Sequence, residues 1–298
     1  MPRYDCFTFI NELDILEIRL KTMAEVIDTF VIVEAPWTFQ GASKPLYFND
    51  NRRRFRHYLP RIRHIVVEDL MAYDNPWHRE YYQRNALRRG LMDAAPDDMV
   101  FISDADEILR PAAVLEADRR AVFCFLRMNH YYYRLNWKVA RPWMKSYCAP
   151  WSFLREIRNL SAPRTFEAEF LVQHGMDPAA HILEDCGWHF AWTGGIPMIM
   201  YKLGAYAHTG PHVQAWRDEA RLLPEVARGR FFSTKEQTVR VALDTMPDIV
   251  QQRRRYYRRK GLLESRAGSL LRLFRIACSS AVAKITKLTR RVQGTGFP

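Results

Sequence analysis

Apolar residues in the first hundred positions alternate between the spacing typical of strands and the spacing typical of helices. Four short apolar runs have the length of buried strands: residues 4–10, 30–34, 64–68 and 99–103. One helical face is predicted by apolar positions that recur every three or four residues: Leu13, Leu16, Leu20 and Met23. Asn11 is the expected N-cap of this helix, and residues 77–92 predict a second helix. This β-α-β-α-β order indicates an α/β fold with a mostly parallel sheet and helices on its faces.

The pattern changes after Pro111. Residues 122–127 and 130–134 predict two adjacent strands, and the aromatic and proline-rich residues 137–153 predict loops with short strands. A regular first half followed by an irregular second half is typical of proteins that pair a nucleotide-binding half with an acceptor half. The predicted parts are a domain over residues 1–250, with halves at 1–111 and 112–250, and a tail over residues 251–298.

The composition is that of a globular protein, with 48% hydrophobic and 26% charged residues. The net charge of +12 comes from the tail: residues 252–298 hold 13 Lys or Arg and one acid, Glu264, whereas residues 1–251 hold 32 of each sign. The body is therefore neutral, and the excess charge says little about its chemistry. Apolar tail positions recur at helical spacing from Leu270 to Val292, which predicts a basic amphipathic helix. Such a helix suits an anionic membrane surface, and the alternatives are a helix docked on the body and a disordered tail.

Five scattered cysteines without a Cys-x-x-Cys pair disfavour both a disulfide framework and a cysteine zinc site. They fit a reducing compartment. No apolar run approaches the roughly 18–20 residues of a membrane span, and the N-terminal residues predict a strand instead of a signal peptide. We expect a cytoplasmic protein whose tail can place it on the inner membrane face.

The strongest chemical signal is the acidic run Ser103-Asp104-Ala105-Asp106-Glu107, which directly follows a buried strand. Three carboxylates in four residues repel one another unless a cation screens them. Mg²⁺ and Mn²⁺ take oxygen ligands and keep positions open for phosphate oxygens. Ligands of parallel sheets bind beyond the carboxyl ends of the strands, so this position favours a metal site. The alternative is a solvated turn that caps the next helix.

Two further groups of residues carry candidate chemistry. Glu80, Arg84 and Asn85 share a predicted helix, where Arg84 could bind a diphosphate or brace the acidic run; the alternative is a surface ion pair with Glu80. The second group offers acids for a general base, an indole face for a sugar ring and imidazoles for a metal: Glu184, Asp185, Trp188, His189 and His208. The alternative for either histidine is a structural role, and the residues alone leave the choice of base open.

Several separate motifs in register resemble glycosyltransferase family 17. They are residues 9–20, 31–34, 44–48, 77–85, 103–108 and 187–190, then Gly194-Gly195, Lys202-Leu203 and His208. The resemblance covers roughly residues 4–215. The middle section is also similar to the pattern of glycosyltransferase family 2, where an Arg-Asn helix precedes a strand and an acidic metal motif, as in Arg84-Asn85 and Asp104-Ala105-Asp106.

The resemblance implies a GT-A-like (Rossmann-like) fold, an inverting mechanism and a nucleotide-sugar donor, with UDP-GlcNAc as the first guess. It implies that Asn11, Glu12, Glu34, Arg84, Asn85 and Asp104 lie around the nucleotide. It also implies Mn²⁺ or Mg²⁺ bound chiefly by Asp106, with Asp104, Glu107 and either His189 or His208 completing the site.

An inverting transferase needs a carboxylate that takes the proton of the attacking hydroxyl. Asp185 is the first candidate for this base and Glu184 the second, because both precede Gly187-Trp188-His189 on the expected acceptor side. The expected acceptor is a glycan or a lipid-linked glycan. Two other readings remain: a non-catalytic glycan- or nucleotide-binding module of the same fold, and a nucleotide-sugar hydrolase. Nucleic-acid binding is disfavoured, since only residues 130–134 and the tail suggest it.

Overall fold

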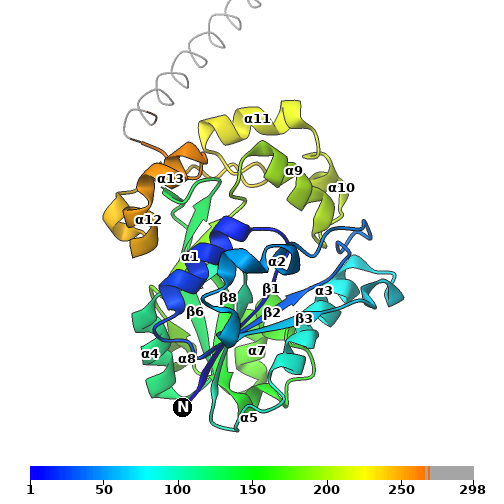
Figure 1. Cartoon of the computed structure of the whole chain (residues 1–298), viewed down its shortest axis with the longest axis vertical. Coiled ribbons are helices and arrows are strands. Elements are labelled where there is room, and N and C mark those ends of the chain that lie inside the picture. Colours follow the sequence, from blue (N-terminus) through cyan, green and yellow to red (C-terminus); the bar gives the residue numbers. More distant parts are fainter. Residues whose placement is uncertain (266–267, 269–298) are drawn as a thin grey trace, which may run out of the picture.

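A computed structural model of the chain describes residues 1–265 and 268 (Figure 1). Its strands are β1 (Arg3–Thr8), β2 (Thr29–Glu34), β3 (Ile62–Val66), β4 (Met99–Asp104), β5 (Glu107–Leu109), β6 (Cys124–Tyr132), β7 (Trp137–Lys138), β8 (Trp143–Pro150), β9 (Ile182–Leu183), β10 (Gly187–Ala191) and β11 (Val239–Arg240). The main sheet has the order β11-β7-β6-β8-β4-β1-β2-β3. Off this path, β9 and β10 pair with β6, and β5 pairs with β10.

The sheet is mixed, which corrects the expectation of a mostly parallel one. Its first half is parallel, because β1 pairs with β2 and β4, and β2 pairs with β3, in that sense. From β8 onward the path turns antiparallel: β8 lies between β4 and β6 and opposes both. The two senses follow from the connections. Helical segments lead into β2, β3 and β4, whereas β6, β7 and β8 follow one another through short loops.

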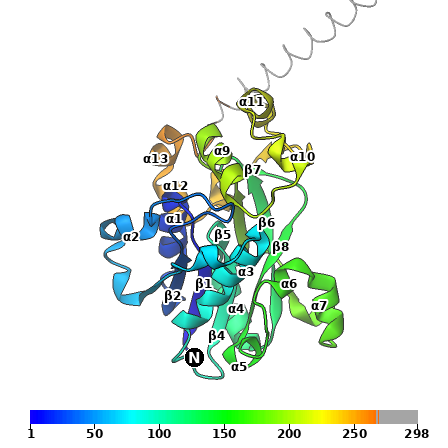
Figure 2. The same cartoon turned by 90° about the vertical axis from the view of Figure 1, so that its right-hand side faces the viewer.

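Helices cover both faces of this sheet (Figures 1 and 2). They are α1 (Leu13–Met23), α2 (Tyr47–Asp50), α3 (Pro76–Asn85), α4 (Pro111–Arg120), α5 (Trp151–Leu154), α6 (Ala162–Thr165), α7 (Glu167–Gln173), α8 (Pro178–His181), α9 (Ile196–Ala205), α10 (Pro211–Gln214), α11 (Glu219–Arg228), α12 (Asp248–Gln252) and α13 (Arg254–Arg259). Figure 2 shows α1 and α12 on one side of the strands and α6 and α7 on the other.

Strand alternation produces two main cores, one on each face. In β1, Phe7 packs with the α1 side and Cys6 packs with the α3 side, as expected for successive side chains that point to opposite faces. A third core joins α9, α10 and α11 to the ends of β7 and β10. These three helices lie beyond the carboxyl ends of the parallel strands (Figure 1), which places them over the edge where ligands of such sheets bind.

Most predicted elements are present, with two corrections in the first half and one in the second. The N-cap of α1 is Glu12, not Asn11, and no side chain caps it. The second helix stops at Asn85 and continues to Gly90 only as a tighter 3-10 turn. The two strands expected at residues 122–127 and 130–134 are one strand, β6. A bulge between Leu126 and Met128 interrupts its pairing with β8, and such a bulge shifts the apolar pattern as a strand boundary would.

The first part of the predicted tail packs on the body. Tyr257, Leu262 and Leu263 are buried in the same core as α1, and Tyr256 donates a hydrogen bond to Asp14 (2.8 Å). The division at residue 250 stays a prediction, but residues up to 264 belong to the packed body. The amphipathic stretch 270–292 lies outside the described residues. Within the described part of the chain, no helix combines the length and apolarity that crossing a membrane requires.

Candidate functional site

The acidic run forms the turn between β4 and β5, at the carboxyl edge of the parallel strands. Arg19 of α1 holds this turn by donating hydrogen bonds to the carbonyl oxygens of Asp104 and Glu107, each at 2.8 Å. Its guanidinium is fully buried and pairs with Asp5 of β1 through Nε (2.7 Å) and Nη2 (2.5 Å). A bidentate pair fixes orientation as well as charge. The backbone that presents the three carboxylates is therefore firmly positioned.

Asp104 is held between two arginines. Arg84 of α3 donates to its Oδ1 (2.8 Å), and Arg164 of α6 donates to its Oδ2 (2.6 Å). Burial alone would raise the pKa of Asp104, but the charges of Arg164 and Arg84 outweigh this effect and lower it. Arg84 also pairs with Glu80 (3.0 Å) and donates to Ser161 (3.1 Å). The predicted Glu80–Arg84 pair is thus present, and it braces the acidic turn.

Glu107 points into the protein and is fully buried. Arg164 pairs with both of its oxygens (2.8 and 2.9 Å), and Trp143 Nε1 and Ser146 Oγ each donate to it at 2.6 Å. Burial would raise the pKa of Glu107, yet the charge and hydrogen bonds of Arg164 lower it to about 2. Its oxygens are occupied by donors from β8 and α6. Glu107 is therefore an anchor for this region, and it faces no open metal position.

Asp106 is the acid of the run that contacts α9, which lies beyond the carboxyl edge of the sheet. Lys202 of α9 donates to its Oδ2 (2.9 Å) and also to Glu12 Oε1 (3.3 Å). His189 Nε2 lies 3.5 Å from Asp106 Oδ1. Burial would raise the pKa of Asp106, but the charge of Lys202 holds it well below its usual range. The same two carboxylates, Asp106 and Glu12, raise the pKa of Lys202 against the effect of burial. One ammonium group thus joins the loop after β1, the acidic turn and α9.

Aromatic rings enclose the inner side of this cluster. His189 of β10 stacks on His130 of β6, with ring centroids 4.6 Å apart. Its ring also lies at a tilt against Trp143, with centroids 4.3 Å apart. Both ring nitrogens of His130 and Nδ1 of His189 are buried without a hydrogen-bond partner. Burial lowers the pKa of His130 to about 2, so this imidazole is neutral.

The donor set fits a divalent cation poorly. Among the described residues, no three His, Cys, Asp or Glu side chains converge as a metal site. Both oxygens of Asp104 are paired with arginines, and Glu107 is enclosed by donors. Asp106 and His189 could offer two ligands, but Lys202 already lies against Asp106. The cation expected at Asp106 stays a prediction, and no reaction step is derived through it.

Other predicted site residues lie elsewhere. Glu34 is buried and accepts hydrogen bonds from the α2 backbone and from His64 (2.9 Å). Asn85 accepts from the backbone of Leu160 (3.0 Å), which fixes the loop that carries Ser161. His208 packs edge-on against Trp77, with ring centroids 4.5 Å apart. These three side chains support the surrounding structure.

The two base candidates are exposed and lie in the segment just before β10. Glu184 pairs with Arg127 (2.5 Å), and Asp185 pairs with Arg110 (3.2 Å). Along the β5–β10 ladder, His189 is opposite Glu107, whereas Gly187 is opposite Leu109, so the chain before Gly187 runs away from the acidic turn. The structure does not bring either acid to Asp106.

Three cations that organise the site were missed as site residues: Arg19, Arg164 and Lys202. Arg164 and Lys202 are separated in sequence from the acids they bind by 60 and 96 residues. Lys202 did fall within one of the matching motifs, which was a usable signal. Arg164 follows a proline in an irregular region, and no local pattern marks it.

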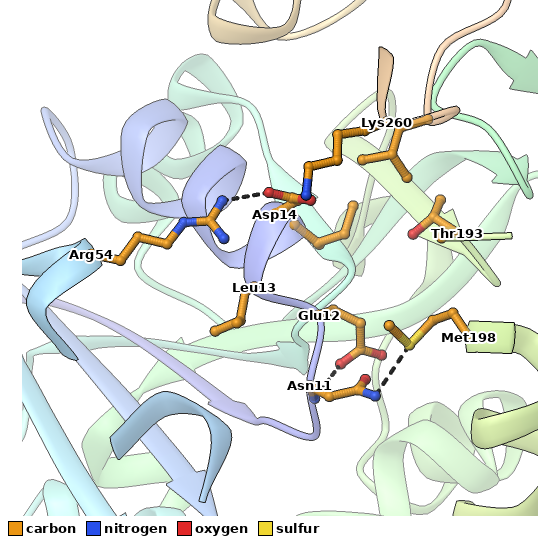
Figure 3. A pocket seen from close by; sticks show the side chains of 11 residues that line it. Asn11, Glu12, Leu13, Asp14, Arg54, Thr193, Met198 and Lys260 are labelled. Atoms are coloured by element: carbon orange, nitrogen blue, oxygen red, sulfur yellow. Dashed lines mark hydrogen bonds and ion pairs between the residues drawn. The ribbon is translucent and has the colours of Figure 1, made fainter. Parts of the chain in front are cut away.

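A pocket of about 220 Å³ adjoins the cluster (Figure 3). Its lining comes from the start of α1, the 3-10 turn after α2, the loop before α9 and the segment after α13: Asn11, Glu12, Leu13, Asp14, Ile15, Arg54, Thr193, Gly194, Met198, Lys260 and Leu262. Asn11 is fixed by a contact from its amide to Met198 Sδ (3.1 Å). Glu12 belongs to both the pocket and the Lys202–Asp106 cluster. Anchored carboxylates, a bridging ammonium and an adjacent pocket can bind an anionic leaving group beside a hydroxyl-bearing substrate.

Comparison with known proteins bears on this arrangement. The model of glycosyltransferase family 17 matches residues 2–232. Similar proteins include the beta-1,4-mannosyl-glycoprotein 4-beta-N-acetylglucosaminyltransferases of Homo sapiens and Rattus norvegicus, each 31% identical over 110 residues, which cover 33% of this chain and 20% of the relative. The chain thus spans about a fifth of the length of these curated relatives.

Among solved structures, the inositol-1-phosphate CTP transferase from T. maritima is similar with a TM-score of 0.35 and 10% identity, over 65% of this chain and 88% of that one. A likeness of that size carries no argument. The family match is different, because it runs through β1, the acidic turn, β10 and α9 and so includes every element that forms the cluster. The chain belongs to glycosyltransferase family 17.

Proposed function

We propose that this glycosyltransferase moves a sugar from a nucleotide-sugar donor to a hydroxyl group of a glycan acceptor, with UDP-GlcNAc as the first donor to test. The observation that carries the proposal is the position of Lys202, which bridges Asp106 (2.9 Å) and Glu12 (3.3 Å) at the carboxyl edge of β4. A fixed cation at this edge can meet the charge of a departing diphosphate. The names of the relatives support N-acetylglucosamine as the transferred sugar.

The proposed step is a single in-line displacement that inverts the anomeric carbon. The acceptor oxygen forms a bond to that carbon while the bond from the carbon to the diphosphate oxygen breaks. The electron pair leaves with the diphosphate, and Lys202 stabilises the added negative charge. Asp106 orients the ammonium, and the Arg84–Asp104–Arg164 group keeps the turn in place. Stabilisation of charge that develops in the transition state is the term that most raises the rate.

A carboxylate must take the proton of the acceptor hydroxyl. Glu12 is the acid best placed for this role, because it lines the pocket and also contacts Lys202. Asp185 and Glu184, the bases expected from the sequence, face Arg110 and Arg127 at the surface. We assign the proton transfer to Glu12.

The test is release of UDP from a panel of UDP-sugars by the full chain, with mannose-containing glycans as acceptors. Lys202→Met and Asp106→Asn are expected to lower turnover by about 10²-fold, the effect of losing one preorganised donor. The matched control is Asp185→Asn, which we expect to stay within about threefold of the unaltered protein. Turnover of no UDP-sugar, or a loss in Asp185→Asn equal to that in Asp106→Asn, would contradict the proposal. Parallel assays with Mn²⁺, Mg²⁺ and EDTA test the predicted cation.

A further inference from the structure

The pocket beside Glu12 is completed by a segment that lies outside the family match. That match ends at residue 232, whereas Lys260 and Leu262 line the pocket. The remaining walls come from the start of α1, the 3-10 turn after α2, and the loop before α9 with the first turn of that helix, which all lie within the match. The pocket is therefore assembled from a shared part and from a part that the family pattern does not specify.

The C-terminal segment is firmly docked where it forms this wall. Leu262 is buried, and its carbonyl accepts a hydrogen bond from the backbone of Leu135 (2.8 Å). Tyr256 donates to Asp14 (2.8 Å), and Arg54 pairs with the same carboxylate (2.5 Å). Both groups donate to Asp14 Oδ1, and Lys260 lies beside Asp14 in the pocket lining (Figure 3). A wall fixed in this way can contribute to recognition without being ordered by the ligand.

The lining has the mixed chemistry that a sugar ring needs. Lys260 and Thr193 can donate hydrogen bonds, Glu12 and Asp14 can accept them, and Leu262 adds apolar surface. A pyranose presents hydroxyl groups that do both, together with apolar C–H faces. The volume of about 220 Å³ is below the roughly 300–1,000 Å³ of pockets for drug-sized ligands, so it suits one ring.

We propose that this pocket binds one neutral pyranose unit of the acceptor and that the segment Tyr256 to Leu262 determines which acceptor this chain takes. The inference rests on the proposed function, since it locates the acceptor on the Glu12 side of the Lys202–Asp106 cluster. Lys260 lies near enough to Asp14 to interact with its charge, and its ammonium is 5.8 Å from the centroid of the Tyr256 ring. No salt bridge among the described residues holds this ammonium, so it can donate to a sugar hydroxyl. Lys260 and Leu262 act as specificity residues.

The test is saturation-transfer difference NMR on the full chain. The probes are the methyl glycosides of mannose, glucose, galactose and N-acetylglucosamine, each measured with UDP in the same sample. Lys260→Ala and Thr193→Val remove lining groups, and Arg259→Ala is the matched control because it removes an equal charge one residue away from Lys260, outside the pocket.

At least one methyl glycoside is expected to give a signal that both lining variants reduce at least threefold and that Arg259→Ala leaves unchanged. The UDP signal is expected to persist in all four proteins. Absence of a signal from every glycoside, or equal signals in the lining variants and the unaltered protein, would overturn the pocket assignment. If UDP itself gives no signal in the unaltered protein, the proposed function fails instead, so the two failures are distinguishable.

Discussion

Replacing Glu107 tests whether the last acid of the run anchors the fold or binds a substrate-bearing cation. The carboxylate is fully buried and receives two bonds from Arg164 and one each from Trp143 and Ser146. Glu107→Gln removes one of the two carboxylates that pair with Arg164 and leaves only Asp104. Breaking a buried pair by removing one partner costs about 3–5 kcal/mol.

The lowered pKa of Glu107 gives a second magnitude. Its pKa falls from the ordinary 4.5 to about 2 in the folded protein. That difference corresponds to about 3 kcal/mol of folding free energy. Because the folded pKa is the lower one, this stability is present above pH 4.5 and is lost as the pH falls towards 2. Both routes give a loss of about 3 kcal/mol for Glu107→Gln at neutral pH.

The assay is urea unfolding at pH 7 followed by tryptophan fluorescence. Glu107→Gln, Arg164→Met and the double variant form a cycle in which we expect a coupling energy of about 2 kcal/mol or more. Glu116→Gln is the control, since this carboxylate is paired with Arg119 and Arg120 on the exposed face of α4 and should leave the urea midpoint nearly unchanged. A Glu107→Gln protein as stable as Glu116→Gln would refute the anchoring role. If it also lost Mn²⁺-dependent binding of UDP, Glu107 would be a metal ligand.

Three further predictions concern stability. Burial lowers the pKa of His130 to about 2, so the unfolded chain binds a proton at higher pH than the folded protein does, and the free energy of unfolding should fall by up to about 1.4 kcal/mol per pH unit below pH 6.5. His130→Phe should make the urea midpoint depend less on pH between pH 7.5 and 5, whereas His57→Phe, at an exposed position, should leave that dependence unchanged. Equal slopes in the two variants would contradict the argument. Tyr257 is fully buried with an unpaired hydroxyl. Tyr257→Ala should therefore lower the free energy of unfolding by about 3–5 kcal/mol in thermal or urea unfolding, whereas Tyr257→Phe should leave it unchanged. An alanine variant as stable as the unaltered protein would show that the C-terminal segment is not part of the core. A Cβ on Gly187 would lie 2.0 Å from a carbonyl oxygen of β5, so Gly187→Ala should lower the melting temperature by several degrees. An unchanged melting curve would show that β5 and β10 lie farther apart at Gly187 than in this structure.

The first half of the fold could be predicted because its signals are local. The strands β1, β2 and β4 are short apolar runs, and α1 shows its buried face as a repeat of three and four residues. The second half gave weaker signals. Because of a bulge in β6, the apolar pattern of this one strand predicts two strands. The order of the elements along the chain does not indicate that β8 lies between β4 and β6 and is antiparallel to both.

The acidic turn could be predicted, but not the role of each acid. Asp104, Asp106 and Glu107 follow a buried strand, which is visible in the sequence. Their different environments depend on Arg164 and Lys202, which arrive from segments 57 to 96 residues away. Neighbouring carboxylates therefore looked equivalent in the sequence, although one is an anchor and another faces the helices above the sheet. The sequence likewise could not show that Glu184 and Asp185 lie away from the acidic turn. Only the pairing of β10 with β5 shows in which direction the segment before Gly187 runs.

The most direct test of the central claim is calorimetric titration of UDP into the full chain and into Lys202→Met, in EDTA and in Mn²⁺. Lys202 is held against Asp106 and Glu12 at the strand edge. A charge-assisted hydrogen bond contributes about 1.5–3 kcal/mol, so its loss should weaken UDP binding by about 10- to 100-fold. Lys260→Ala serves as the control and should bind UDP as the unaltered chain does. Equal affinity of Lys202→Met and the unaltered chain would contradict the assignment of this cluster to the donor diphosphate.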